Sequence, residues 1–267
     1  MSDILAGLKI INMKQDWLKI VIWISLVFFL VAFASCSRSS KNRESYLLVK
    51  SGYDKFNKGD YTEAVKDLSV SIKLNPTNEP AYFVRGETKY SLNDFSGAMA
   101  DYNKAIELNS CDWKAYNNRG ILKDKLKDYS GALTDYNEAI TRSPNTAEIY
   151  NNRGVSKRGL KDYTGAIADF NTAFELKPFY RNALLNRGLT KAFNNDYSGA
   201  IADLNKVIAV NPSWELAYFN RGLIKADMKN YQEAIADFDE AIKLKPLYAE
   251  AYQNRDRAIA LLKNSQK

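Results

Sequence analysis

The sequence contains no histidine and only two cysteines, Cys36 and Cys111, among its 267 residues. Histidine is the commonest general base and metal ligand, and two cysteines alone do not complete a four-ligand zinc site. No nucleophile paired with a base stands out among the other residues. We therefore expect a protein that is not an enzyme and that holds no metal and no cofactor.

The chain also lacks the concentrated positive charge of a nucleic-acid-binding protein. Its formal net charge is +7, but residues 1–44 carry six Lys and Arg against three Asp and Glu, which leaves 32 against 28 over the other 223 residues. Nucleic-acid binding usually shows as a basic stripe with aromatic residues for stacking. We expect neither a nucleic-acid partner nor a small-molecule substrate. A hydrophobic content of 46% is enough to bury a core.

Only one long apolar run is present, and it lies near the amino terminus. Residues 20–34 read IVIWISLVFFLVAFA and follow Lys14 and Lys19. As a helix, 15 residues would reach about 22 Å, which is short of the roughly 30 Å hydrocarbon core of a bilayer. The run therefore fits the apolar region of a signal peptide better than a membrane span.

The residues that follow this run resemble the lipobox of bacterial lipoproteins. Residues 33–36 read FASC, an apolar residue and two small ones before a cysteine. The resemblance implies that residues 1–35 are a signal peptide, that Cys36 is lipidated and holds the protein on a membrane, and that residues 36–44 are a polar tether. The alternative is an uncleaved N-terminal signal anchor. Translation could begin at Met1 or at Met13.

Glycine and alanine recur through the rest of the chain with a fixed period of 34 residues. A small residue at fixed places on two consecutive helices allows the helices to approach closely. A third small residue and an apolar residue recur at their own positions, and proline closes most units. The glycines are Gly52, Gly86, Gly120, Gly154, Gly188 and Gly222, and the alanines twelve residues later are Ala64, Ala98, Ala132, Ala166, Ala200 and Ala234.

This pattern resembles the tetratricopeptide repeat. The resemblance implies an all-α fold, a right-handed superhelical solenoid of six helix-turn-helix units with a C-terminal capping helix. The cap is residues 249–267, where Asp256 replaces the expected glycine because no partner helix follows. The six units are residues 45–78, 79–112, 113–146, 147–180, 181–214 and 215–248.

Three charged residues keep the same period and indicate a structural role. Arginine precedes the glycine in five units and in the cap, lysine follows the glycine by three residues, and aspartate follows it by fifteen. Ser51 replaces the arginine of the first unit, so six aspartates match six arginines only between units. We therefore expect pairs from Asp67 with Arg85 to Asp237 with Arg255, with each lysine beside the pair.

Asparagine stands two residues before the glycine and is expected to face the inner groove. Two residues correspond to about 200° around a helix, so this side chain faces away from the partner helix. Asparagine is a poor residue for a helix interior, but its amide can both donate to and accept from the backbone of an extended peptide. The row resembles asparagine ladders of armadillo proteins. Its members are Asn118, Asn152, Asn186, Asn220 and Asn254.

Neighbouring groove positions are expected to set specificity. They are apolar toward both ends, at Val49, Tyr53 and Phe83 and at Leu185, Leu189, Phe193, Phe219 and Leu223, and polar in the middle, at Asn117, Asp124, Lys125, Asn151 and Arg158. The apolar residues could instead be half-buried between helices. The asparagine row could also be a by-product of repeat duplication, or its side chains could bond only along the row. If the row binds peptide, truncating Asn152 and Asn186 to alanine should weaken binding and leave stability nearly unchanged.

The sequence therefore predicts a membrane-tethered adaptor that binds extended polypeptide segments of partner proteins. By analogy with the family, partners would be envelope-assembly or cell-wall proteins. The protein would lie outside the cytoplasm. In a Gram-negative organism Ser37, in place of aspartate after the cysteine, favours the outer membrane. The alternative function is a self-associating structural component of an envelope complex.

Overall fold

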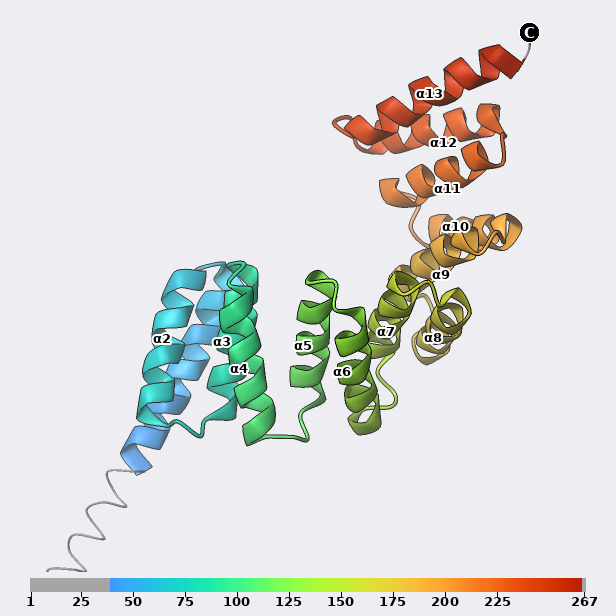
Figure 1. The fold of residues 1–267 in the computed structure, drawn as a ribbon. Coiled ribbons are helices and arrows are strands. Elements are labelled where there is room, and N and C mark those ends of the chain that lie inside the picture. Colours follow the sequence, from blue (N-terminus) through green and yellow to red (C-terminus); the bar gives the residue numbers. More distant parts are fainter. Residues whose placement is uncertain (1–38, 266–267) are drawn as a thin grey trace, which may run out of the picture. The chain divides into compact units, whose positions relative to one another are not determined.

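A computed structural model of the chain describes residues 39–265, and all regular structure within this range is α-helical (Figure 1). The predicted signal segment and Cys36 lie outside these residues. A first helix covers residues 39–58. The others are α2 (Tyr61–Leu74), α3 (Glu79–Ser91), α4 (Phe95–Leu108), α5 (Trp113–Lys125), α6 (Tyr129–Arg142), α7 (Ala147–Gly159), α8 (Tyr163–Leu176), α9 (Arg181–Phe193), α10 (Tyr197–Val210), α11 (Glu215–Asp227), α12 (Tyr231–Leu244) and α13 (Ala249–Ser265).

The described helices form antiparallel pairs, and each pair is one predicted repeat. We call the first helix of each pair the A helix and the second the B helix. One compact unit ends at Leu108 and contains two pairs; the second begins at Asn109 and contains four pairs and the cap α13. In Figure 1 the pairs of the second unit run in order from green to red. The all-α helical-repeat fold with six pairs and a terminal helix is confirmed, although residues 39–44 of the predicted tether are helical.

In every repeat except the fifth, the glycine of the A helix lies directly against a large side chain of its own B helix. A Cβ added to Gly120 would lie 2.7 Å from Cε1 of Tyr136, and one added to Gly154 would lie 2.7 Å from Cε1 of Phe170. Both aromatic side chains are fully buried. The predicted close approach of the paired helices at glycine is therefore confirmed.

The turn between the paired helices has the same backbone form in every repeat. One residue seven positions after the glycine has a positive φ, and the next residue caps the B helix. In four repeats an aspartate at that cap accepts from a backbone N–H, as where Asp128 Oδ1 accepts from Gly131 N at 2.9 Å. The positive-φ residues of these six turns are Gly59, Asn93, Lys127, Lys161, Asn195 and Lys229.

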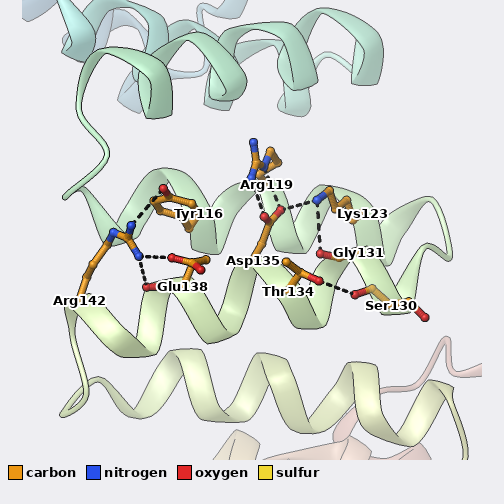
Figure 2. Close-up of polar contacts among 9 residues, drawn as sticks. All are labelled: Tyr116, Arg119, Lys123, Ser130, Gly131, Thr134, Asp135, Glu138 and Arg142. Atoms are coloured by element: carbon orange, nitrogen blue, oxygen red, sulfur yellow. Dashed lines mark hydrogen bonds and ion pairs between the residues drawn. The ribbon is translucent and has the colours of Figure 1, made fainter.

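Each recurring aspartate of repeats two to six is held by an arginine and a lysine of its own repeat. Arg119 donates to both carboxylate oxygens of Asp135 at 2.9 and 2.6 Å, and Nζ of Lys123 lies 2.8 Å from Oδ2 (Figure 2). Asp135 is only 1% exposed, and the side chains of Arg119 and Lys123 are 18% and 20% exposed. We call this arrangement, in which two cations surround a buried carboxylate, the buried triad. The other triads are Arg85, Lys89 and Asp101; Arg153, Lys157 and Asp169; Arg187, Lys191 and Asp203; and Arg221, Lys225 and Asp237.

The predicted pairing of each aspartate with the arginine of the next repeat, from Asp67 with Arg85 to Asp237 with Arg255, is wrong. Arg85 binds Asp101 of its own repeat, while Asp67 accepts from Ser51 and Lys55 at 2.6 Å each. Arg255 of the cap contacts Asp239 and Asp256 instead. The reason is the close approach of the two helices of one repeat at the glycine. Arginine directly precedes this glycine, and aspartate directly precedes the large side chain that packs on it. The arginine and the aspartate of the same repeat therefore face each other.

The arginines nevertheless connect successive repeats, through a residue that the sequence analysis did not single out. Nη1 of Arg153 donates to Oδ1 of Asn137 at 2.8 Å, and Nη1 of Arg187 donates to Oδ1 of Asn171 at 2.7 Å. Each of these asparagines stands two residues after the aspartate of the preceding repeat. Each of these guanidinium groups therefore donates to the aspartate of its own repeat through Nε and Nη2, and to the asparagine of the preceding repeat through Nη1.

Candidate functional site

In the second unit the A helices of successive repeats contact one another, in the order α5, α7, α9, α11 and α13. Among the described residues of this unit, no two B helices contact each other. The A helices therefore line the inner side of this unit. The predicted asparagine row belongs to these helices, with one member each in α5, α7, α9, α11 and α13.

Part of the asparagine row is joined by a chain of amide hydrogen bonds. Asn186 Nδ2 donates to Asn151 Oδ1 at 3.0 Å, and Asn151 Nδ2 donates to Asn152 Oδ1 at 3.3 Å. The chain continues from Asn152 Nδ2 to Asn117 Oδ1 at 3.1 Å and from Asn117 Nδ2 to Asn118 Oδ1 at 3.2 Å. All four bonds run in one direction, from α9 through α7 to α5. The side chains do bond along the row, through asparagines three before the glycines.

The two remaining members of the row bond within their own helices. Asn220 Nδ2 donates to Leu216 O at 2.7 Å, and Asn254 Nδ2 donates to Glu250 O at 2.8 Å. Neither bond connects repeats. Substitution of these two residues is therefore expected to disturb the stack less than substitution of Asn152 or Asn186.

The positions three before the glycine are mostly enclosed by the helices. Asn117 and Asn151 are 8% and 7% exposed, and Leu185 is also buried. Phe83 packs against Tyr102 with ring centroids 6.3 Å apart, and Phe219 packs against Tyr248 at 4.8 Å. These side chains hold neighbouring helices together, and they leave little surface for a guest to contact.

The amide chain changes what truncation of the row should do. Asn152→Ala with Asn186→Ala would remove two inter-repeat bonds, at 3.1 and 3.0 Å, each contributing about 1 kcal/mol. We therefore expect the double variant to melt at a lower temperature in a calorimetric scan. Asn220→Ala with Asn254→Ala serves as the matched control and should melt close to the wild-type temperature. Equal melting of the two double variants would show that the amide chain does not support the stack.

Two cavities open in the second unit, between successive A helices and the first residues of B helices. The first, of about 270 Å³, is lined by Tyr129, Val155, Arg158, Gly159, Tyr163 and Phe193. The second, of about 360 Å³, is lined by Leu189, Ala192, Phe193, Tyr197, Leu223 and Ile224, and by the polar residues Asn195, Asn220 and Asp227. Phe193 is shared by both and is 62% exposed. Of the expected groove residues, the structure therefore brings Asn220, Leu189, Phe193 and Leu223 to one cavity.

The position four after the glycine explains where the larger cavity opens. In the first two repeats this position holds Phe56 and Tyr90, which contact Tyr61 and Phe95 with centroids 5.7 Å apart in both pairs. In the fifth repeat the position holds Ala192, which leaves space beside Tyr197. The sequence shows the change from aromatic to alanine, but not that the surrounding helices leave the space unfilled.

Asp124, at the same position of the third repeat, is a half-buried carboxylate that links two repeats. It accepts from Ser156 Oγ at 2.6 and 2.8 Å and from Tyr136 OH at 2.8 Å. Burial raises the pKa of Asp124 above its usual value, although the two hydroxyl donors oppose the shift. Its protonated form is therefore favoured by folding. The stability that this form contributes is present at low pH and is lost as pH rises through the raised pKa.

Asp124→Asn is expected to keep or raise the melting temperature at pH 7. Asparagine retains an oxygen that accepts from Ser156 and Tyr136, while the buried charge is removed. Asp124→Ala should instead destabilise by about 1–3 kcal/mol, because two buried hydroxyls lose their acceptor. Thermal melts of both variants at pH 7 and pH 4 measure this. A larger loss in the asparagine variant than in the alanine variant at pH 7 would contradict this account of the charge.

Comparison with known proteins agrees with the repeat pattern. Family models described as tetratricopeptide repeat match residues 79–110, 113–146, 147–180 and 216–248. These ranges coincide with the helix pairs α3–α4, α5–α6, α7–α8 and α11–α12. A search of curated protein sequences finds no match.

Several solved structures have the same fold at low sequence identity. The Cut9–Hcn1 hetero-tetramer of the APC/C matches with a TM-score of 0.71 and 18% identity over 86% of this chain, which spans only 45% of that longer chain. PilF of Pseudomonas aeruginosa matches with a TM-score of 0.69 and 15% identity over 82% of this chain and 99% of its own. YrrB, described as a TPR protein with an unusual peptide-binding site, matches with a TM-score of 0.55 and 22% identity over 71% of this chain and 97% of its own. The family models, the 34-residue period and the paired helices identify tetratricopeptide repeats in this chain, and the solved structures share their fold.

Proposed function

We propose that this protein is an adaptor that binds extended segments of partner polypeptides along the A helices of its second unit. Tetratricopeptide repeats are protein-interaction units, and the fold supports such a scaffold role. The observation that carries the proposal is the amide chain from Asn186 to Asn118 on the A helices, together with two open cavities in the same unit. Arg158, which lines the first cavity, contacts Asn186 at the start of the chain. Inter-repeat bonds fix the orientation of the amides before any peptide arrives.

The amides of the row retain hydrogen-bonding capacity beyond the chain. A primary amide nitrogen carries two hydrogens and its oxygen two lone pairs. Asn152 donates one hydrogen to Asn117 and accepts one bond from Asn151. Its second amide hydrogen is available to donate to a C=O group of an extended backbone, and the second lone pair of its oxygen is available to accept from an N–H group. Repeats about 10 Å apart would then present one amide for every three residues of the guest.

We further propose that the protein works at a membrane surface outside the cytoplasm. The support is the sequence of residues 20–36, an apolar run that ends in FASC, which favours removal of residues 1–35 and lipidation of Cys36. Within the described range no helix combines the length and apolar character needed to cross a bilayer. Mass spectrometry of the mature amino terminus tests this proposal. We expect a chain that begins with a diacylated or triacylated Cys36. A mature chain that still begins at residue 1 or residue 13 would contradict the proposal.

A photo-crosslinking experiment tests the binding surface in native membranes. A photoreactive phenylalanine analogue at position 193 should capture a polypeptide, because Phe193 lies exposed between the two cavities. The same analogue at Lys206, exposed on the B helix α10, is the matched control and should capture little. Equal capture at both positions would contradict groove binding.

Asn220→Ala provides the second arm of that experiment. Asn220 lines the larger cavity and bonds only within α11, so its truncation should reduce capture at position 193 by several fold without changing the melting temperature. Capture of another copy of this chain, together with dimers in light scattering, would favour the self-associating structural component over the adaptor.

A further inference from the structure

Arg158 is a partly buried cation whose contacts differ from those of the repeated arginines. Each arginine of the buried triads lies 2.6 or 2.7 Å from a carboxylate oxygen. Among the described residues Arg158 has no ion pair within 4 Å, and its hydrogen bonds are limited to Asn186, at 3.4 Å to the backbone oxygen and 3.5 Å to Oδ1. Both distances are at the outer limit of a hydrogen bond. Its guanidinium therefore has donors to spare.

The carboxylate at the equivalent position of the preceding repeat does not compensate this charge. Asp124 is bound by Ser156 and Tyr136, as described above. Burial lowers the pKa of Arg158 below its usual value, and no opposing charge raises it. Enclosing a guanidinium without an anion is unfavourable, and the free energy is recovered when an anion binds.

The surroundings of Arg158 form a site with aromatic walls. The cavity of about 270 Å³ that it lines also contains Tyr129, Tyr163 and Phe193. Tyr163 and Phe193 stack with ring centroids 6.1 Å apart and an interplanar angle of 12°. A Cβ added to Gly159 would lie 2.8 Å from Tyr129, so the third ring lies directly on the helix beside Arg158. Apolar walls lower the local dielectric and strengthen any ion pair formed there.

We propose that this cavity binds a carboxylate of the guest polypeptide, with Arg158 as its cationic partner. A planar guanidinium matches a carboxylate with two parallel hydrogen bonds. The cavity of about 360 Å³ on the other side of Phe193 then takes an apolar side chain about three residues away, at the spacing of one repeat. This inference rests on the proposed function, because it names what the groove recognises.

The first test uses small probes and does not depend on peptide binding. The full chain in mild detergent, labelled with ¹⁵N, is titrated with phenylacetate or with the neutral phenylacetamide. The Nε–H resonance of Arg158 is assigned by its loss in Arg158→Gln. It should shift at least 5-fold further when phenylacetate is added than when phenylacetamide is added. Equal shifts with both probes, or none, would overturn the carboxylate site.

The second test separates the two sources of a carboxylate. Three fluorescein-labelled peptides are compared by anisotropy: Leu-Ala-Ala-Glu-Ala-Ala-Leu and the same peptide with Gln for Glu, both amidated, and Leu-Ala-Ala-Gln with a free carboxyl terminus, which keeps a leucine three residues from the terminal carboxylate. Leucine on both sides of the amidated peptides allows for either chain direction. The Glu peptide should bind at least 10-fold more tightly than the amidated Gln peptide if a side chain is recognised, and the free-terminus peptide should do so if the terminus is recognised.

Two variants distinguish the carboxylate site at Arg158 from peptide binding by the rest of the groove. Arg158→Gln should abolish the preference for a carboxylate, whereas Arg257→Gln, which removes an exposed charge of α13, should retain it. Peptides that bind without any preference would overturn the carboxylate site and leave the proposed function standing. A response to phenylacetate with no binding of any peptide would confirm the site and contradict the groove as a peptide-binding surface.

Discussion

Replacing Asp203 by alanine is expected to lower the free energy of unfolding by about 3–5 kcal/mol, because it breaks a buried ion cluster and leaves the cations behind. Asp203 is 2% exposed and accepts from Arg187 at 2.8 and 2.6 Å, and Nζ of Lys191 lies 2.9 Å away. The side chain of Arg187 is itself mostly buried. Urea unfolding followed by circular dichroism measures the loss.

The structure offers an exposed ion pair of the same length as a control. Lys177 and Glu148 lie 2.6 Å apart, but their side chains are 55% and 46% exposed. Glu148→Ala should therefore cost less than about 1 kcal/mol, because solvent screens the pair. If the two alanine variants lost similar stability, burial would not be what makes the triad important.

The stability lost in Asp203→Ala should depend on pH in a defined direction. Burial alone would raise the pKa of Asp203, but the bonds from Arg187 and Lys191 outweigh it and hold the pKa below its usual value. A carboxylate with a lowered pKa stabilises the fold above its unfolded pKa of about 3.9 and loses this contribution as pH falls through the folded pKa. The difference between wild type and variant should thus be constant from pH 5 to 7 and shrink in more acidic solution.

In a repeat protein this loss should begin locally. Each helix pair contacts mainly its neighbours, so stability is close to a sum over repeats and their interfaces. Arg187 also donates to Asn171 of the preceding repeat at 2.7 Å. Hydrogen exchange should therefore accelerate first in α9 and α10, and next in α8, before the remaining helices respond.

The triads show which part of the fold a repeated sequence predicts well. The 34-residue period correctly predicted the positions of the helix pairs and their close approach at glycine, because both depend only on the spacing of residues along the chain. The partner of each arginine depends on which side chains face each other across two helices. The equal numbers of aspartates and arginines carry no information on which side chains face each other, and Arg255 in the cap contacts Asp239 and Asp256.

The candidate site was harder to predict for a related reason. The spacing identified the asparagine row, but not that Asn117 and Asn151 would accept hydrogen bonds from the next repeat. Nor did it show that Arg158, one of several polar residues at the middle of the groove, would lie beside three aromatic rings without an ion pair in the described structure. Residue identity gives the chemistry of a position, and only packing shows whether its partners are already present.

Gly154→Ala is expected to destabilise the fold by about 1–3 kcal/mol, the usual effect of overpacking, even though alanine is favoured in helices by about 1 kcal/mol. The added Cβ would lie 2.7 Å from Cε1 and 2.9 Å from Cζ of Phe170, which is fully buried. Chemical denaturation of the variant measures the balance between the two effects.

Gly188→Ala, the same substitution one repeat later, is expected to leave stability unchanged or to raise it by up to about 1 kcal/mol. Its nearest neighbours would be Ala200 O at 3.3 Å, Asp203 Cβ at 3.4 Å and Leu204 Cγ at 3.5 Å, all farther away than the ring atoms that face Gly154. Leucine opposite the glycine does not itself make this room, because a Cβ on Gly52 would lie 2.6 Å from Cγ of Leu68. Opposite signs for Gly154→Ala and Gly188→Ala would show that the fit of each helix pair, and not the repeat consensus, sets the requirement for glycine. Equal losses at both positions would contradict this view.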